Sequence, residues 1–218
     1  MTNNQKKIFL ESEGDAWFER NKKPSLPENY IQIDSILSGL LKVKESHLLP
    51  IKPKLLEVGC GEGLRLEWIQ RNWDYDCLGI DPSQKAIQRA KLRGVQCVQG
   101  TADSLPFEDN SLDILVYGFC LYLCDRTDLF KIALEGHRVL KSNGWIVIRD
   151  FFTTTPCQRE YHHRPGIFSY KMDYRKLFDW HPEYQTFFHE VTHHSEKVFT
   201  DELQEWVAVS ILRKIKLH

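Results

Sequence analysis

The sequence predicts a doubly wound α/β fold, and three observations lead to this prediction. Apolar runs alternate with segments of helical periodicity from about residue 54 to residue 150. A glycine-rich turn follows the first apolar run, and acidic residues follow the next two. Strands that alternate with helices favour right-handed crossovers and a mostly parallel sheet with helices on both faces.

The expected elements follow one another regularly along the chain. Strands are expected at 54–58, 76–80, 95–99, 112–118 and 144–150, and helices at 64–72, 83–93 and 126–140. Each strand is a short apolar run, whereas each helix repeats its apolar residues every three or four positions. The region therefore reads as a single α/β unit.

The residues before the first strand predict a helical cap. In residues 28–45 the apolar side chains recur at helical spacing, and residues 46–54 contain two prolines, which is typical of a linker. We expect residues 1–50 to form a cap or lid on a domain that spans residues 51–218. Trp17, Phe18 and Arg20 either fold over a cofactor and exclude water or attach an N-terminal helix to the sheet.

The residues after the fifth strand have a different character. Residues 151–182 are rich in aromatic side chains and show little periodicity, so we expect a substrate-recognition insertion with a short helix at 171–179. Residues 185–195 and 205–215 read as two strands that close the sheet as an antiparallel hairpin.

Composition excludes several classes of protein. The chain has 218 residues and a formal net charge of -1, which favours one domain and argues against a nucleic-acid partner. None of its six cysteines forms a CxxC pair, so we expect reduced thiols. No signal-peptide apolar region and no run of about 18 apolar residues is present, so we expect a cytoplasmic protein without a membrane partner.

The glycine-rich turn "GCGEG" indicates a ligand site. Gly59, Gly61 and Gly63 follow the first strand, where α/β sheets bind ligands and where glycine allows positive φ and close approach. A nicotinamide dinucleotide site prefers GxGxxG, with the pyrophosphate on the helix N-terminus. Here the spacing is GxGxG, and Glu57 places a carboxylate before the turn. A cationic ligand without phosphate, such as S-adenosylmethionine, suits that arrangement better.

Two further acids extend the pattern. Asp81 follows the second strand, where its carboxylate can accept from both ribose hydroxyls, and Asp103 follows the third, where it can accept from the adenine amine. The backbone N–H of Ala102 would meet the ring, with Leu78 or Ile80 and Leu105 on its faces. The expected cofactor contacts are Glu57, Gly59, Cys60, Gly61, Asp81, Pro82, Ala102, Asp103, Tyr117, Phe119 and Trp17.

With "LLEVGCGEG", "LGIDPS", "GTADSLPFEDNSLDILVYGFCLYLCD" and "RVLKSNGWIVIRDF" in this order, the chain resembles the class I S-adenosylmethionine-dependent methyltransferases. The resemblance implies a seven-stranded Rossmann-like sheet of order 3-2-1-4-5-7-6, with an antiparallel last hairpin, and S-adenosylmethionine as cofactor. The head "GDAWFERN" and the tail "TPCQREYHHRPGIFSYKMDYRKLF" also resemble the methylases associated with pseudaminic acid biosynthesis.

Methyl transfer from a sulfonium depends mainly on geometry. Positioning supplies roughly 7 to 11 kcal/mol, while a general base adds about 10²- to 10⁴-fold and matters mainly for a hydroxyl acceptor. Tyr122 either orients the acceptor or packs on the cofactor, and Asp150 either points into the cleft or ties down a loop. His162 and His163 are candidate bases, with solvated or core histidines as the alternative.

Other polar residues of the tail suggest binding rather than metal chemistry. As an alternative to a histidine base, Arg159 and Arg164 of the tail would bind a carboxylate or phosphate of a sugar acceptor through paired hydrogen bonds. Residues 189–193 read HEVTH, but they fall in an expected strand rather than a helix, and adjacent histidines on a strand point to opposite faces, so no metal is expected.

The sequence thus predicts a methyltransferase that uses S-adenosylmethionine and acts on oxygen or nitrogen of a small polar metabolite, for example a sugar or nucleotide sugar. The protein is expected to be a monomer or a homodimer. Two alternatives remain, namely an NAD-dependent oxidoreductase on a similar sheet and a non-catalytic module that binds S-adenosylmethionine.

Overall fold

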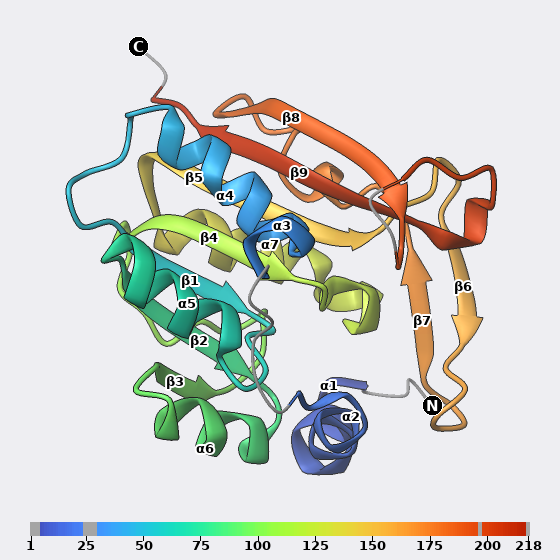
Figure 1. The fold of residues 1–218 in the computed structure, drawn as a ribbon. Coiled ribbons are helices and arrows are strands. Elements are labelled where there is room, and N and C mark those ends of the chain that lie inside the picture. The colour runs from blue at the N-terminus through green and yellow to red at the C-terminus, as the bar shows by residue number, and fades with distance from the viewer. Residues whose placement is uncertain (1–4, 24–29, 196–197, 217–218) are drawn as a thin grey trace.

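A seven-stranded sheet forms the centre of the computed structural model, which describes residues 5–23, 30–195 and 198–216 (Figure 1). Its strands are β1 (Lys54–Val58), β2 (Asp76–Asp81), β3 (Gln96–Gln99), β4 (Leu112–Gly118), β5 (Leu140–Phe151), β8 (Tyr184–His193) and β9 (Trp206–Lys214). Their order is β3-β2-β1-β4-β5-β9-β8; neighbours from β3 to β5 are parallel, and β9 is antiparallel to both β5 and β8. The predicted fold is confirmed. The predicted order 3-2-1-4-5-7-6 is confirmed as well: β6 and β7 form a separate sheet, so β8 and β9 are the sixth and seventh strands of the main sheet.

Helices cover both faces of the sheet, as the doubly wound prediction requires. One face packs against α4 (Ser35–Glu45), α5 (Leu64–Trp73) and α6 (Gln84–Leu92), and the other against α7 (Leu129–Val139) and the 3-10 turn η4 (Tyr174–Leu177). Successive strand residues alternate between the two cores: Leu55 is buried in the first core and Leu56 in the second. The strands are therefore apolar on both sides.

The helix boundaries differ from the predicted ones at two places. The segment predicted as one helix at 28–45 is divided into α3 (Tyr30–Ile33) and α4, because Asp34 caps α4 by accepting from the Leu37 N–H at 2.9 Å; residues 28–29 lie outside the described residues. The helix expected at 126–140 begins as the 3-10 turn η3 (Arg126–Asp128) and ends at Val139, where β5 follows directly.

The helix predicted within the inserted segment is shorter than expected. Residues 157–171 form a hairpin of β6 (Cys157–Glu160) and β7 (Phe168–Lys171), and the helix expected at 171–179 is only the single turn η4. Of the eight strand residues only Lys171 is buried. A hairpin with no buried face has no apolar alternation to reveal it.

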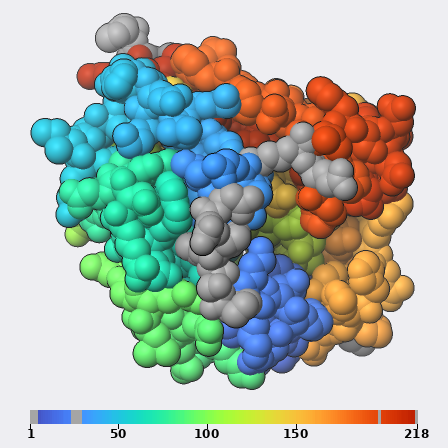
Figure 2. All heavy atoms as spheres, in the orientation of Figure 1, coloured from blue at the N-terminus to red at the C-terminus, as the bar shows by residue number. Residues whose placement is uncertain are grey.

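The N-terminal segment forms a wall beside the carboxyl ends of the strands. It consists of α1 (Gln5–Ile8), the π-helical turn η1 (Phe9–Glu13) and α2 (Gly14–Asn21). Figure 2 shows this segment in dark blue between the green region of α6 and the orange β6–β7 hairpin. Residues 1–4 and 24–29 of the expected cap lie outside the described residues.

The six cysteines are free thiols, and Cys60, Cys77 and Cys97 are buried. Among the described residues, no helix is both long and apolar enough to cross a membrane.

Candidate cofactor-binding site

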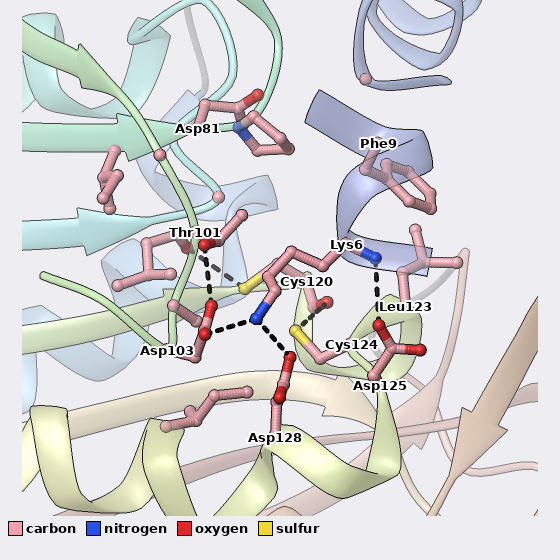
Figure 3. Close-up of a pocket in the computed structure, with 18 of the residues that line it drawn as sticks. Lys6, Phe9, Asp81, Thr101, Asp103, Cys120, Leu123, Cys124, Asp125 and Asp128 are labelled. Atoms are coloured by element: carbon pink, nitrogen blue, oxygen red, sulfur yellow. Dashed lines mark hydrogen bonds and ion pairs between the residues drawn. The ribbon is translucent and has the colours of Figure 1, made fainter. Parts of the chain in front are cut away.

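A cavity lies at the carboxyl ends of β1, β2 and β4, against the N-terminal segment (Figure 3). Its volume is about 840 Å³ including the part open to solvent. The residues that matter most for its chemistry are Lys6, Trp17, Gly59, Asp81, Asp103 and Phe119.

The glycine-rich turn has the backbone that the sequence predicts. Gly59, Gly61 and Gly63 have φ of 76°, 53° and 73°. A Cβ at Gly59 would lie 2.7 Å from the Cβ of Cys120, so the turn also needs the missing side chain for space. Gly59 lines the cavity, whereas Gly61 does not.

Asp81 lines the cavity and is held in place by the backbone. One carboxylate oxygen accepts from the Gly61 N–H at 2.9 Å and the other from the Ser83 N–H at 2.9 Å. Burial raises the pKa of Asp81 to about 6, although both hydrogen bonds oppose this change. Pro82 lies beside it on the cavity wall.

At the other end of the cavity, Asp103 is paired with a lysine that sequence reasoning missed. The Lys6 ammonium lies 2.6 Å from Asp103 and 2.9 Å from Asp128, and Thr101 donates to Asp103 at 2.7 Å (Figure 3). Burial acts to raise the pKa of Asp103, but Lys6 and Thr101 outweigh it and lower the pKa. Nothing in the polar head distinguishes Lys6, because its partners lie about 100 positions away.

Glu57 does not line the cavity, and its charge is compensated. Its side chain forms an ion pair with Arg65, which also donates to both oxygens of Asp34 at 2.9 to 3.2 Å. Burial raises the pKa of Glu57 to about 7 although Arg65 lowers it. Its second oxygen has no hydrogen-bond partner among the described residues. Because Arg65 folds back onto the Glu57 carboxylate, Glu57 does not face this cavity, and its contact with the cofactor stays a prediction.

The remaining predicted cofactor contacts divide into two groups. Trp17, Pro82, Ala102 and Phe119 line the cavity. Cys60 and Tyr117 do not: the Tyr117 ring is fully buried in the second core, where its hydroxyl donates to the Ile132 carbonyl at 3.4 Å. Tyr117 therefore offers no side-chain contact to a ligand in this cavity.

Of the two alternatives for Asp150, the structure shows the loop-holding one. Its carboxylate accepts from the backbone N–H groups of Leu121, Tyr122 and Phe151 at 2.8, 3.3 and 2.8 Å. Burial raises the pKa of Asp150 to about 7 in spite of these bonds. Tyr122 is also buried, with its ring centroid 5.0 Å from that of Phe119, so it lies behind the cavity wall.

The structure does not bring the predicted bases to the cavity. His162 and His163 lie in the turn between β6 and β7, beside Tyr161, and neither lines the cavity. Arg164 donates to the Ser12 hydroxyl at 2.7 Å, which attaches this turn to the N-terminal segment. Arg159 lies in the exposed strand β6 and does not line the cavity either.

Within the described part of the chain, one group of side chains has the spacing of metal ligands. His137, His181 and Glu183 offer atoms within 4.8 Å of one another. They lie where β5 and β8 begin, so they are at the opposite ends of the strands from the cavity.

Comparison with known proteins agrees with this geometry. Residues 56–148 match the family model described as methyltransferase domain. The matched residues include the glycine turn, Asp81 and Asp103.

Named relatives and solved structures resemble the chain as well. It is 33% identical over 106 residues to an uncharacterized methyltransferase of Synechocystis (47% of this chain, 50% of that protein), and 32% identical over 107 residues to the uncharacterized methyltransferase YcgJ of Bacillus subtilis (45% and 41%). The chain therefore spans half or less of these curated relatives.

Among solved structures, the 1,6-didemethyltoxoflavin-N1-methyltransferase of Burkholderia thailandensis, with bound 1,6-didemethyltoxoflavin and S-adenosylhomocysteine, superposes with a TM-score of 0.68 at 13% identity (96% of this chain, 89% of that chain). A methyltransferase of Methanosarcina mazei superposes with 0.65 at 17% identity (80% and 98%). At such identities the likeness shows the fold alone.

Proposed function

We propose that this chain is an S-adenosylmethionine-dependent methyltransferase that acts on oxygen or nitrogen of a small polar metabolite. The observation that carries the proposal is the arrangement along one edge of the sheet. A bare glycine turn follows β1, Asp81 follows β2 and Asp103 follows β3, and Gly59 and both acids line one cavity. A nucleoside with a short cationic tail matches this order of groups.

Each end of the cavity has its own role in holding S-adenosylmethionine. Asp81 accepts from the ribose hydroxyls, while Asp103 and the backbone of Ala102 face the adenine. Ile80, whose side chain lines the cavity, packs on the base. Gly59 and Phe119 face the amino-acid tail and the sulfonium, which supplies the methyl group. Among the described residues, no lysine or arginine lines the cavity at this end, which suits a cation rather than a pyrophosphate.

The N-terminal segment is the lid of this site. Phe9, Gly14 and Trp17 line the cavity. Closing this wall over the ligand would exclude water from the sulfonium. The acceptor is a small molecule, for which the resemblance of head and tail to sugar-modifying methylases favours a sugar or nucleotide sugar.

Calorimetry with S-adenosylmethionine and NAD tests the cofactor. We expect binding of the first alone, weakened about 10- to 100-fold by Asp81→Ala because two charge-assisted hydrogen bonds are lost. Binding of NAD in its place would support the oxidoreductase alternative and refute the proposal.

Turnover needs its own measurement. Formation of S-adenosylhomocysteine with a panel of sugars, nucleotide sugars and amines distinguishes an enzyme from a binding module. Tight binding of the cofactor without product from any acceptor would favour the binding module.

A further inference from the structure

A cluster of three rings adjoins the cavity at its Phe119 end. The imidazole of His194 stacks on Phe119 and on Phe151, with centroids 5.3 and 5.2 Å apart, and the two phenyl rings lie 4.9 Å apart. Phe119 follows β4, Phe151 ends β5 and His194 follows β8. Because β5 and β8 are both antiparallel to β9, they run in the same direction, so all three rings lie at the ligand-binding edge.

Phe119 connects the cavity to this cluster through an unusual backbone. Its φ is 62°, in the left-handed region that a non-glycine residue adopts at a cost, and such residues gather at functional sites. Its N–H donates to the Arg149 carbonyl at 2.9 Å, and the Arg149 guanidinium lies 4.6 Å from its ring centroid. The ring thereby lines the cavity and also stacks on His194, which does not itself line the cavity.

His194 differs from its neighbours on the same strand in its hydrogen bonds. His189 pairs through Nδ1 with the Ser210 hydroxyl at 2.9 Å, and His193 Nδ1 accepts from the Ser195 N–H at 3.1 Å. Within the described residues, neither ring nitrogen of His194 has a hydrogen-bond partner; only its backbone carbonyl is bonded, by Arg149 at 3.3 Å. The ring packs by its face and leaves its nitrogens available.

The charges around His194 keep it neutral. Burial lowers its pKa, and so do Arg149 of β5, Lys171 of β7 and the adjacent His193, while Glu205 of η5 (Leu203–Glu205) acts in the opposite direction. A neutral imidazole near neutral pH can accept a proton.

We propose that the methyl acceptor binds between the Phe119 end of the cavity and His194, and that His194 removes the proton of an acceptor hydroxyl. This inference rests on the proposed function. It narrows the acceptor atom from oxygen or nitrogen to oxygen. The acceptor oxygen gives its proton to a ring nitrogen of His194 and bonds to the methyl carbon, while the carbon–sulfur bond breaks and its electron pair remains on sulfur.

An experiment that needs no acceptor tests the position of His194. S-adenosylmethionine carries a positive sulfur and S-adenosylhomocysteine a neutral one, so a histidine beside the methyl group has a lower pKa in the first complex. We expect a difference of about 0.5 unit or more for His194 by NMR titration of the imidazole signals. His137, at the opposite edge of the sheet, is the internal control and should show no difference.

The outcomes separate the two proposals. Equal His194 pKa values in two complexes of demonstrated affinity would overturn this inference and leave the proposed function standing. Failure of S-adenosylmethionine to bind would overturn both.

Variants give a second, independent readout. With a hydroxyl acceptor, His194→Gln should lower kcat about 10²- to 10⁴-fold and remove the acidic limb of the pH profile, with cofactor affinity unchanged. His193→Gln removes the adjacent imidazole and should leave kcat and cofactor affinity unchanged; because His193 lowers the pKa of His194, the acidic limb should persist and shift to slightly higher pH. Full activity of His194→Gln on a hydroxyl acceptor would contradict the assignment.

Discussion

Three carboxyl groups with a raised pKa at the carboxyl ends of the strands differ in what they can do, because each has different partners. Asp150 accepts three backbone N–H groups and holds the loop after β4, and Glu57 is paired with Arg65. Asp81 alone of the three lines the cavity. A raised pKa therefore marks a ligand contact only where the carboxylate also faces open space.

We expect the affinity for S-adenosylmethionine to fall as the pH drops below about 6, the pKa to which burial raises Asp81. The protonated acid is a poorer acceptor for ribose hydroxyls, so affinity at pH 5 should be about tenfold lower than at pH 8. Calorimetry from pH 5 to 8 measures this, and Asp81→Asn should bind weakly without that pH dependence.

The same titration affects folding with the opposite sign. Because the pKa of Asp81 is raised on folding, its contribution to stability is fully present below its usual pKa, near 4, and is lost as the pH rises through about 6.

For the binding prediction, wild-type affinity that stays constant down to pH 5 would mean that Asp81 does not contact the ribose.

Arg65→Met should destabilise the fold by about 3 to 5 kcal/mol at pH 7, because it leaves Asp34 and Glu57 buried without their cation. The loss of stability should be smaller at pH 5, because Glu57 is then protonated and no longer a buried charge without a partner. Urea unfolding at both pH values measures it.

Arg71→Met is the matched control. Arg71 is exposed and pairs with Glu67 one turn away on the same helix α5, so the expected change is less than about 0.5 kcal/mol. Equal effects of the two variants would contradict a special role for the buried pair.

At the scale of elements, the N-terminal segment is held by a few specific contacts. Asp15 accepts from the Ser83 hydroxyl at 2.7 Å and from the Lys85 N–H at 3.0 Å, at the beginning of α6. A Cβ at Gly14 would lie 2.7 Å from the Phe9 carbonyl and 3.1 Å from the Ser83 nitrogen, so glycine permits this close approach. Such an element can open without unfolding the sheet.

Gln5→Ala should release this segment. The buried Gln5 amide donates to the carbonyls of Leu123 and Phe168 at 3.0 and 3.1 Å and accepts from the Phe168 N–H at 2.6 Å. Losing them should cost about 1 to 3 kcal/mol locally, and limited proteolysis should cleave the segment about 5- to 100-fold faster.

Glu11→Gln, at an exposed position of the same segment, is the control for this experiment. Unchanged proteolysis of Gln5→Ala would show that other contacts hold the segment.

At the scale of the whole molecule, the sheet order separates the cofactor from the ring cluster. The cavity spans the ends of β2, β1 and β4, and the rings of Phe119, Phe151 and His194 span β4, β5 and β8. The reversal at β9 makes β8 parallel to β5, which delivers His194 to the ligand-binding edge. The antiparallel strand β9 thus allows β8 to place His194 at the same ends of the strands as the cavity.

The sequence alone determined the α/β class, the strand positions and the roles expected of Gly59, Asp81 and Asp103. These features are local: a strand is an apolar run, and the ligand-binding residues come directly after strands. The parallel arrangement then places all such positions at one edge, so local patterns suffice to predict that they meet.

Only the tertiary structure decided the rest. Lys6 meets Asp103, Arg65 covers Glu57, and His194 packs on Phe119, each from a distant part of the chain or another element. The β6–β7 hairpin was missed because it buries almost nothing. Periodicity reports which face of an element is buried, but the partner of a single charged or aromatic side chain depends on how the elements pack.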